Sequence, residues 1–189
     1  LLSYLNAYNL AEVCLIGHSM GGKAAMTFSC TYPERVNKLV VVDIAPKYYP
    51  PHHQEILSGL KAVDRSTITS RKDADQILSQ YFSESAMRQF LLKNLYWRSS
   101  TELTFKFNLK VLSDQIENVG QALHINALFD KPTLFIVGQA SNYIKETDVE
   151  LIEAHFTDFE IVEIPKSGHW VHAENPDQFF DKVSHFLIY

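Results

Sequence analysis

Four short apolar runs recur along the chain and predict buried β-strands. They occupy residues 12–16, 39–42, 133–137 and 159–164. Because most of these runs are apolar at successive positions, they are typical of strands with helices packed on both faces. Apolar residues at helical spacing occupy residues 1–10, 23–32, 148–156 and the segment that begins at residue 176. This alternation of strands and helices predicts an α/β fold with a mostly parallel sheet.

The alternation stops between Pro46 and Leu128. Apolar spacing in this stretch predicts helices at residues 54–63, 73–82, 86–96 and 109–119, and a short extended piece at 101–107. The stretch is much longer than an ordinary connection between strands. We therefore predict a helical cap formed by residues 47–125, inserted into a core formed by residues 1–46 and 126–189. A long helical connection is the alternative interpretation.

Composition and charge narrow the classes of protein that fit this pattern. The 189 residues carry a formal net charge of −5 and are 46% hydrophobic, as in a globular chain. The acidic charge argues against nucleic acid as a partner. The longest aliphatic runs are far shorter than the ~20 residues that cross a bilayer, so no membrane span is expected. Two cysteines, Cys14 and Cys30, favour a reducing compartment over a disulfide framework.

The run GHSMGG at residues 17–22 matches the G-x-S-x-G pattern between a predicted strand and a predicted helix. In this context the pattern indicates a sharp turn that presents the hydroxyl of Ser19 as a nucleophile at a helix N-terminus. The tight turn explains the glycines two residues to either side, which have no side chain. The backbone N–H of Met20 would supply one donor of an oxyanion hole. A glycine-rich structural turn is the alternative.

A general base for Ser19 is expected in the loop after the last strand. His169 follows that strand in the run PKSGH at residues 165–169, and His172 is its one serious rival. His18 flanks the nucleophile and is expected to shape the turn. No group of histidines and carboxylates has the spacing of metal ligands, so the sequence predicts neither a metal site nor a cofactor.

The acid that orients the histidine is harder to assign. The loop after residues 133–137 is its common position, but residues 138–143 contain no carboxylate. Asp43 ends the apolar run 39–42, where a carboxylate is costly unless it has a partner, at the edge where ligands bind in open α/β sheets. We therefore assign the acid to Asp43. Glu146 and Asp148 are the alternatives.

Several segments together resemble the YbfF-type esterases of the α/β-hydrolase fold. They are GHSMGGK from residue 17, VVVDIAP from residue 40, FLLKNL from residue 90, FIVG from residue 135 and GHWVHAENP from residue 168. The resemblance covers nearly the whole chain. It implies a small cytosolic enzyme that cleaves esters or acyl thioesters under a helical lid. It also implies an aspartate after the sixth strand of the family's sheet, which matches Asp43.

The resemblance further implies that the front of the fold is not in this chain. In this fold several strands precede the nucleophile, together with a His-Gly loop that donates the second oxyanion N–H. Only eighteen residues precede Ser19, whereas one strand–helix–strand unit takes about 30 residues. We therefore expect an N-terminally incomplete hydrolase that lacks the first strands and the oxyanion loop, and we expect the missing half of the fold as its partner.

Aromatic residues are frequent in the predicted cap and beside the candidate catalytic residues. Part of them must form the core of the cap. We expect Tyr48, Tyr49 and Trp170, together with His18, to contact substrate between the cap and the sheet. Such a site predicts a small acyl ester or thioester as the ligand. The alternatives are a lyase or acyltransferase with the same triad, and a binding domain or fragment without activity.

Overall fold

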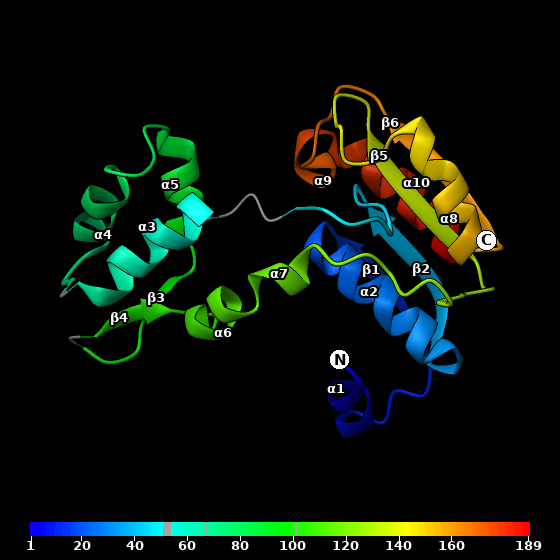
Figure 1. The fold of residues 1–189 in the computed structure, drawn as a ribbon, viewed down its shortest axis with the longest axis horizontal. Coiled ribbons are helices and arrows are strands. Elements are labelled where there is room, and N and C mark those ends of the chain that lie inside the picture. Colours follow the sequence, from blue (N-terminus) through cyan, green and yellow to red (C-terminus); the bar gives the residue numbers. More distant parts are fainter. Residues whose placement is uncertain (51–53, 67, 101) are drawn as a thin grey trace. The chain divides into compact units, whose positions relative to one another are not determined.

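The computed structural model describes residues 1–50, 54–66, 68–100 and 102–189. The chain divides into two compact units (Figure 1): the first consists of Leu1–Tyr49 with Gly120–Tyr189, and the second of Pro50–Val119. The predicted boundaries differ from this division, since they put residues 47–49 and 120–125 in the cap. The difference arises because both of these segments hydrogen-bond within the first unit.

A four-stranded sheet forms the centre of the first unit. Its strands are β1 (Val13–His18), β2 (Val36–Val42), β5 (Thr133–Gly138) and β6 (Phe159–Ile164). They lie in the order β1-β2-β5-β6, and each neighbouring pair is parallel. All four predicted strands are present, and the predicted α/β fold with a parallel sheet is confirmed.

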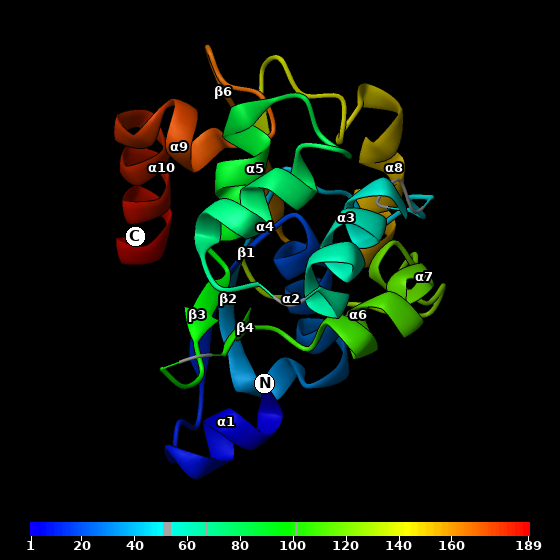
Figure 2. The same cartoon turned by 90° about the vertical axis from the view of Figure 1, so that its left-hand side faces the viewer.

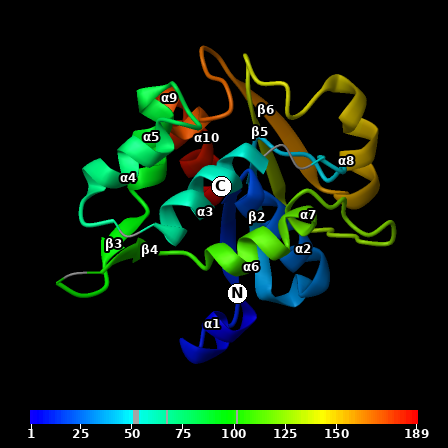
Figure 3. The same cartoon turned by 60° about the vertical axis from the view of Figure 1, so that its left-hand side comes forward.

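Helices cover both faces of this sheet. They are α2 (Met20–Thr31) and α8 (Val149–His155) on one face and α10 (Pro176–Ile188) on the other (Figure 2 and Figure 3). Leu39 and Val41 of β2 belong to an apolar cluster with α2 and α8. Val40 and Val42 belong to a second cluster that contains Val183 of α10. Because successive strand residues point to opposite faces, one apolar run fills two cores.

Shorter elements complete the first unit. They are α1 (Leu2–Ala7), α9 (Val171–Glu174) and two 3₁₀ helices (Pro33–Arg35 and Glu146–Asp148). The helix predicted at residues 1–10 ends at Ala7. Asn9 adopts a φ of 52°, a left-handed conformation that asparagine tolerates and that interrupts a helix. Arg35 holds the segment that follows α1, because its guanidinium donates to the carbonyls of Leu10 and Ala11, each at 2.8 Å.

Strand β1 lies at the edge of the sheet. It pairs with β2 on one side, and no other strand in the described part of the chain pairs with it. Ile16, near its middle, has a side chain that is 52% exposed. That further strands precede β1, as the sequence analysis expects, stays a prediction.

The second unit contains five helices and a short antiparallel strand pair among its described residues. They are α3 (Gln54–Arg65), α4 (Arg71–Leu78), α5 (Ser85–Leu92), α6 (Leu109–Asp114), α7 (Ile116–Val119), β3 (Leu95–Trp97) and β4 (Leu103–Phe105). They enclose a core of their own, which includes Leu57, Leu60, Val63, Leu78, Leu91, Leu95, Phe105 and Leu109. The predicted extended piece at 101–107 corresponds to β4, although Thr101 itself lies outside the described residues. That this unit acts as a lid stays a prediction.

Three helices predicted in the second unit differ from the structure. The helix expected at residues 73–82 ends at Leu78, and the one expected at 109–119 is divided at Gln115 into α6 and α7. The helix expected at residues 86–96 ends at Leu92, and Leu95–Trp97 form β3 instead. The guanidinium of Arg71 donates to the carbonyl of Leu92 and, at 2.5 Å, to that of Leu95. These carbonyls are therefore held by a side chain from α4, and the aromatic residues that follow favour a strand.

The helices of both units are short. The longest are α10, with 13 residues, and α2 and α3, with 12 residues each. Within residues 1–50, 54–66, 68–100 and 102–189, no helix is long and apolar enough to cross a membrane.

The two segments that connect the units lie side by side within the first unit. The N–H of Tyr49 donates to the carbonyl of Gly120 at 2.8 Å, and the N–H of Leu123 donates to the carbonyl of Pro46 at 2.9 Å. A Cβ on Gly120 would collide with the carbonyl oxygen of Tyr49. Glycine at this position therefore lets the two segments approach closely.

Lys23 of α2 binds both connecting segments. Its side chain is buried, at 7% exposure, and its ammonium donates to the carbonyls of Lys47 and Gln121, the latter at 2.9 Å. The ammonium also lies 5.1 Å from the ring centroid of Tyr49. Burial, and next the charge of Lys47, lower the pKa of Lys23 from its ordinary 10.5 to about 8.

This lowered pKa predicts how stability depends on pH. Between pH 8 and 10.5 the unfolded chain, in which Lys23 keeps its ordinary pKa, binds more protons than the folded chain. The free energy of unfolding should therefore rise with pH in this window, by at most about 1.4 kcal/mol per pH unit. Urea unfolding of the wild type and of Lys23→Met at several pH values measures this dependence. The free energy of unfolding should rise with pH in the wild type only. An equal pH dependence in both proteins would contradict the assignment to Lys23.

Candidate functional site

Ser19 lies in a strained turn between β1 and α2. Its φ and ψ are 53° and −117°, a conformation that costs free energy for a residue with a side chain. Its N–H donates to the carbonyl of Val42 at 3.0 Å, and its carbonyl accepts from the N–H of Lys23 at 3.0 Å as the first bond of α2. The sheet and the helix together therefore hold Ser19 in this turn.

The glycines near Ser19 permit close packing, although not all at the expected positions. A Cβ on Gly17 would collide with the carbonyl oxygen of Gly21, and a Cβ on Gly22 would lie 2.6 Å from Cγ2 of Ile44. A Cβ on Gly21 would meet no atom within 4 Å. The steric explanation is therefore correct for Gly17 and wrong for Gly21. Gly22 instead allows α2 to lie close to the sheet.

Asp43 follows β2 at the same edge of the sheet. It has a φ of 52°, in the left-handed region that aspartate tolerates, and its side chain is 0% exposed. Its Oδ1 accepts from the N–H of Gly138 at 3.2 Å, and its Oδ2 accepts from the hydroxyl of Ser141 at 2.5 Å and from Nδ1 of His169 at 2.7 Å. These donors offset the cost of burying a carboxylate.

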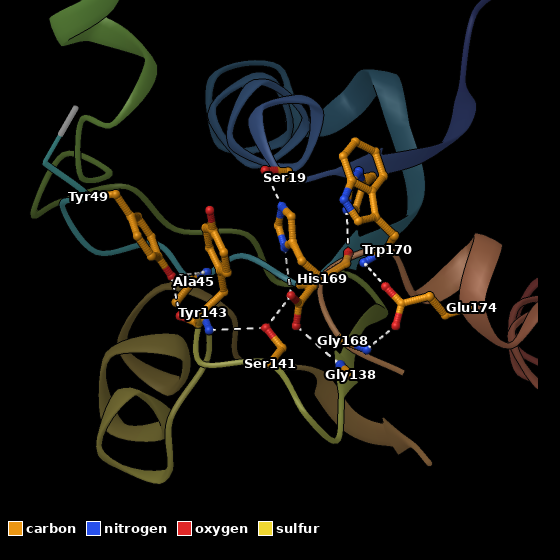
Figure 4. A network of polar contacts seen from close by, with 12 residues as sticks. Ser19, Ala45, Tyr49, Gly138, Ser141, Tyr143, Gly168, His169, Trp170 and Glu174 are labelled. Atoms are coloured by element: carbon orange, nitrogen blue, oxygen red, sulfur yellow. Dashed lines mark hydrogen bonds and ion pairs between the residues drawn. The ribbon is translucent and has the colours of Figure 1, made fainter. Parts of the chain in front are cut away.

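The imidazole of His169 lies between Asp43 and Ser19. Figure 4 shows its ring directed at Ser19. Its Nδ1 is 2.7 Å from Oδ2 of Asp43, and its Nε2 is 3.0 Å from Oγ of Ser19. Because a carboxylate only accepts hydrogen bonds, Nδ1 carries the proton and Nε2 has a lone pair directed at the serine hydroxyl. This tautomer can accept the proton of Ser19.

His172 and Asp148, which the sequence offered as an alternative base and an alternative acid, make other contacts. The ring of His172 packs edge-on against the ring of His18, with centroids 5.0 Å apart. Asp148, the alternative acid, forms an ion pair with Lys47 at 2.5 Å and accepts from the N–H of Lys145 at 2.9 Å. The structure therefore brings Ser19 together with His169 and Asp43. His172 and Asp148 instead contact residues other than Ser19.

The loop after β5 contributes two side-chain contacts that the sequence did not lead us to expect. The hydroxyl of Ser141 binds Asp43, and the ring of Tyr143 stacks on the ring of His169 with centroids 3.9 Å apart and planes at 15°. The carbonyl of Tyr143 accepts from the hydroxyl of Tyr49 at 2.5 Å. The sequence signal for these contacts is the polar and aromatic character of residues 138–143.

The four residues expected to contact substrate have different surroundings. Tyr48 is 49% exposed and Trp170 is 43% exposed, and the ring of Trp170 lies 5.9 Å from that of His169. The hydroxyl of Tyr49 also accepts from the N–H of Ala45 at 2.9 Å, so Tyr49 takes part in internal packing. Its contact with substrate, like that of the other three residues, stays a prediction.

His18 has a structural contact with the loop that carries His169. Its Nε2 lies 2.7 Å from the carbonyl oxygen of His169. Burial lowers the pKa of His18 from its usual 6.5 and outweighs the opposing effect of this hydrogen bond. The neutral form is therefore favoured at neutral pH, and its Nε2–H donates to the carbonyl.

The arrangement has the parts of a nucleophilic site. A hydroxyl, an imidazole and a buried carboxylate lie in line, and they follow β1, β6 and β2 at the carboxyl ends of parallel strands. Met20 is the first residue of α2, so its N–H belongs to the first turn, whose N–H groups have no carbonyl partner within the helix. Negative charge that develops beside Ser19 would be stabilised there.

Comparison with known proteins agrees with this geometry. The family model described as alpha/beta hydrolase fold matches residues 2–176. Esterase YbfF of Escherichia coli is 37% identical over 99% of this chain and 72% of its own length. The mouse sn-1-specific diacylglycerol lipase ABHD11 is 35% identical over 94% of this chain and 60% of its own. A solved structure, a marine microorganism esterase, is 36% identical with a TM-score of 0.90, over 98% of this chain and 74% of its own. The chain thus spans only part of each relative.

Proposed function

This chain belongs to the α/β-hydrolase fold family, and from that premise we propose that it is a serine hydrolase of carboxylic esters or acyl thioesters. In this proposal Ser19 is the nucleophile, His169 the general base and Asp43 the orienting acid. The observation that carries it is the unbroken series of hydrogen bonds from Asp43 through His169 to Ser19, at 2.7 and 3.0 Å. The resemblance to YbfF-type esterases stated from the sequence is confirmed.

The proposed reaction has two steps. Nε2 of His169 accepts the hydroxyl proton while Oγ of Ser19 attacks the acyl carbon, and the imidazolium then protonates the leaving alcohol or thiol. Water adds to the resulting acyl-serine in the same way, which releases the acid and restores the enzyme. The N–H of Met20 is the proposed donor to the oxyanion.

Covalent labelling of Ser19 tests this proposal most directly. A fluorophosphonate reacts with a serine only when its base and its oxyanion donors are in place, so the label reports on several parts of the site at once. We expect mass spectrometry of the full-length protein to locate one adduct, on Ser19. An intact, folded protein that takes up no label, or that takes it up at another serine, would contradict the proposal.

We further propose that the substrate carries an apolar acyl chain. The support is the aromatic side chains at the site: the ring of Trp170 lies near His169, and the rings of Tyr143 and Tyr49 stack with centroids 5.6 Å apart. Such rings favour apolar groups, and ligand sites are mostly apolar clefts with a few polar groups.

An ester series of increasing acyl length checks this substrate class. Each buried methylene contributes up to ~0.8 kcal/mol, so kcat/KM for p-nitrophenyl esters should rise by up to about fourfold per carbon until the chain no longer fits. The same series of acyl thioesters shows whether both classes are cleaved. An equal kcat/KM from acetate to decanoate, or a preference for an amide, would exclude an apolar acyl site.

A cytoplasmic location is part of the proposal. Both cysteines are free, Cys14 exposed and Cys30 half-buried. Burial raises the pKa of Cys30 to about 11, which keeps its thiol protonated and unreactive. Free thiols of this kind are typical of proteins from reducing compartments.

A further inference from the structure

The loop that carries His169 lies between β6 and α9, outside regular secondary structure, and side chains bind its backbone. Oε2 of Glu174 accepts from the N–H of Gly168 at 2.6 Å, and Oε1 accepts from the N–H of Trp170 at 3.2 Å (Figure 4). The carbonyl of His169 binds Nε2 of His18 at 2.7 Å. Two side chains therefore hold polar backbone groups of three consecutive residues, with the candidate base in the middle.

Glu174 is well placed to act on this loop. It is the last residue of α9, and its own N–H donates to the carbonyl of Trp170 at 2.9 Å, so its backbone and its side chain both bind the residue after His169. Its side chain is exposed. Hydrogen bonds from N–H groups to a carboxylate are stronger than neutral ones, and the one carboxylate bridges the residues on either side of the histidine.

The imidazole has little freedom to move if both of its hydrogen bonds are to persist. Nδ1 must stay near Asp43 while Nε2 stays near Ser19, at 2.7 and 3.0 Å. A shift of the loop by about 1 Å would weaken at least one bond, and a misplacement of that size can cost up to about 100-fold in turnover. The base thus depends on the groups that fix its backbone.

We propose that Glu174 is a positioning residue: its carboxylate fixes the backbone on both sides of His169 and so keeps the imidazole between Asp43 and Ser19. This inference rests on the proposed function, because it assigns Glu174 a role in the reaction of Ser19. Glu174 itself touches neither substrate nor the reacting atoms in this assignment. Without it, water can bind the two exposed N–H groups, so the fold should survive while the histidine loses alignment.

Kinetics of Glu174 variants in the full-length protein test this role. In Glu174→Ala we expect kcat for p-nitrophenyl butyrate to fall by about 10- to 100-fold, with KM little changed, because substrate binding does not use the carboxylate. Glu174→Gln keeps one acceptor oxygen and should lie between Glu174→Ala and the wild type. Glu153→Ala, which removes an exposed glutamate of α8, is the matched control and should leave kcat unchanged.

Amide hydrogen exchange supplies a readout that does not depend on activity. The N–H groups of Gly168 and Trp170 should exchange faster in Glu174→Ala, whereas the amides of β5 and β6 should keep their protection. Faster exchange across the whole first unit would instead indicate a structural role and would overturn the inference. If Glu174→Ala does not fold, Glu174→Gln decides by the same two measurements.

Two outcomes separate this inference from the proposed function. A kcat of Glu174→Ala within twofold of the wild type, with Ser19→Ala inactive, would overturn the role of Glu174 alone. A wild-type protein that takes up no fluorophosphonate at Ser19 would overturn the proposed function and, with it, the catalytic role of Glu174. Slower labelling of Ser19 in Glu174→Ala than in Glu153→Ala would support the inference.

Discussion

Ser19→Ala should abolish ester hydrolysis while leaving the fold intact, and this is the largest effect we expect from a single substitution. Loss of a catalytic serine in other serine hydrolases lowers kcat by about 10⁶-fold. The effect is large because the acyl-enzyme cannot form without Oγ, so the two-step route is closed. Alanine should also be tolerated locally, since the bonds that hold the turn come from the backbone of Ser19.

The measurement is the hydrolysis rate of p-nitrophenyl butyrate by the full-length protein, with thermal unfolding as the check on folding. Ser29→Ala is a suitable control. Ser29 is fully buried in α2, and its hydroxyl forms no hydrogen bond within the described residues. This variant should retain wild-type turnover. Activity of Ser19→Ala within tenfold of the wild type would rule out Ser19 as the nucleophile and would direct attention to another residue at the edge of the sheet.

Local sequence patterns were sufficient to predict which three residues come together at the candidate site. Ser19 stands in a motif whose neighbours in sequence also form its turn, and Asp43 stands at the end of an apolar run. Each of these patterns spans only a few consecutive residues. Because β1 and β2 are parallel, the residues that follow them lie at the same edge of the sheet. His169 was predictable for the same reason, because it follows the last strand.

The contacts that refine the site depend on residues distant in sequence and were therefore not predictable. The loops after β5 and β6 are held together by backbone bonds: the N–H of Gln139 donates to the carbonyl of Ile164 at 3.0 Å, and that of Ala140 to Ser167 at 2.8 Å. This pairing brings Ser141 to the carboxylate of Asp43. The sequence of each loop alone does not predict which residues of the loop after β5 will lie opposite which residues of the loop after β6.

The end of α5 in the second unit also depends on a residue distant in sequence. Apolar spacing continues from α5 into residues 95 and 96, so periodicity alone predicts one helix. The guanidinium of Arg71, more than twenty residues earlier in the chain, binds the carbonyls of Leu92 and Leu95 and ends that helix. Such a tertiary contact overrides a local preference, which is weak for each residue.

The assignment of the acid leads to the second large effect. Asp43→Asn should lower kcat by about 10⁴-fold, as the equivalent change does in another serine hydrolase, without loss of the fold. The physical reason is the tautomer of His169. An amide can present its NH₂ group to Nδ1 and thereby favour the proton on Nε2, and a protonated Nε2 cannot accept the proton of Ser19. The amide also has no net charge to stabilise the imidazolium.

Asp148→Asn is the matched control, because Asp148 is also a buried aspartate and was the alternative acid. Its carboxylate binds Lys47 and the N–H of Lys145, so its loss should lower the melting temperature and leave turnover per folded molecule near that of the wild type. Comparing kcat and thermal unfolding in both variants separates the two roles. If Asp148→Asn instead loses more activity than Asp43→Asn, the acid is misassigned. The bonds from Asp43 to His169, Ser141 and Gly138 would then serve only to stabilise the edge of the sheet.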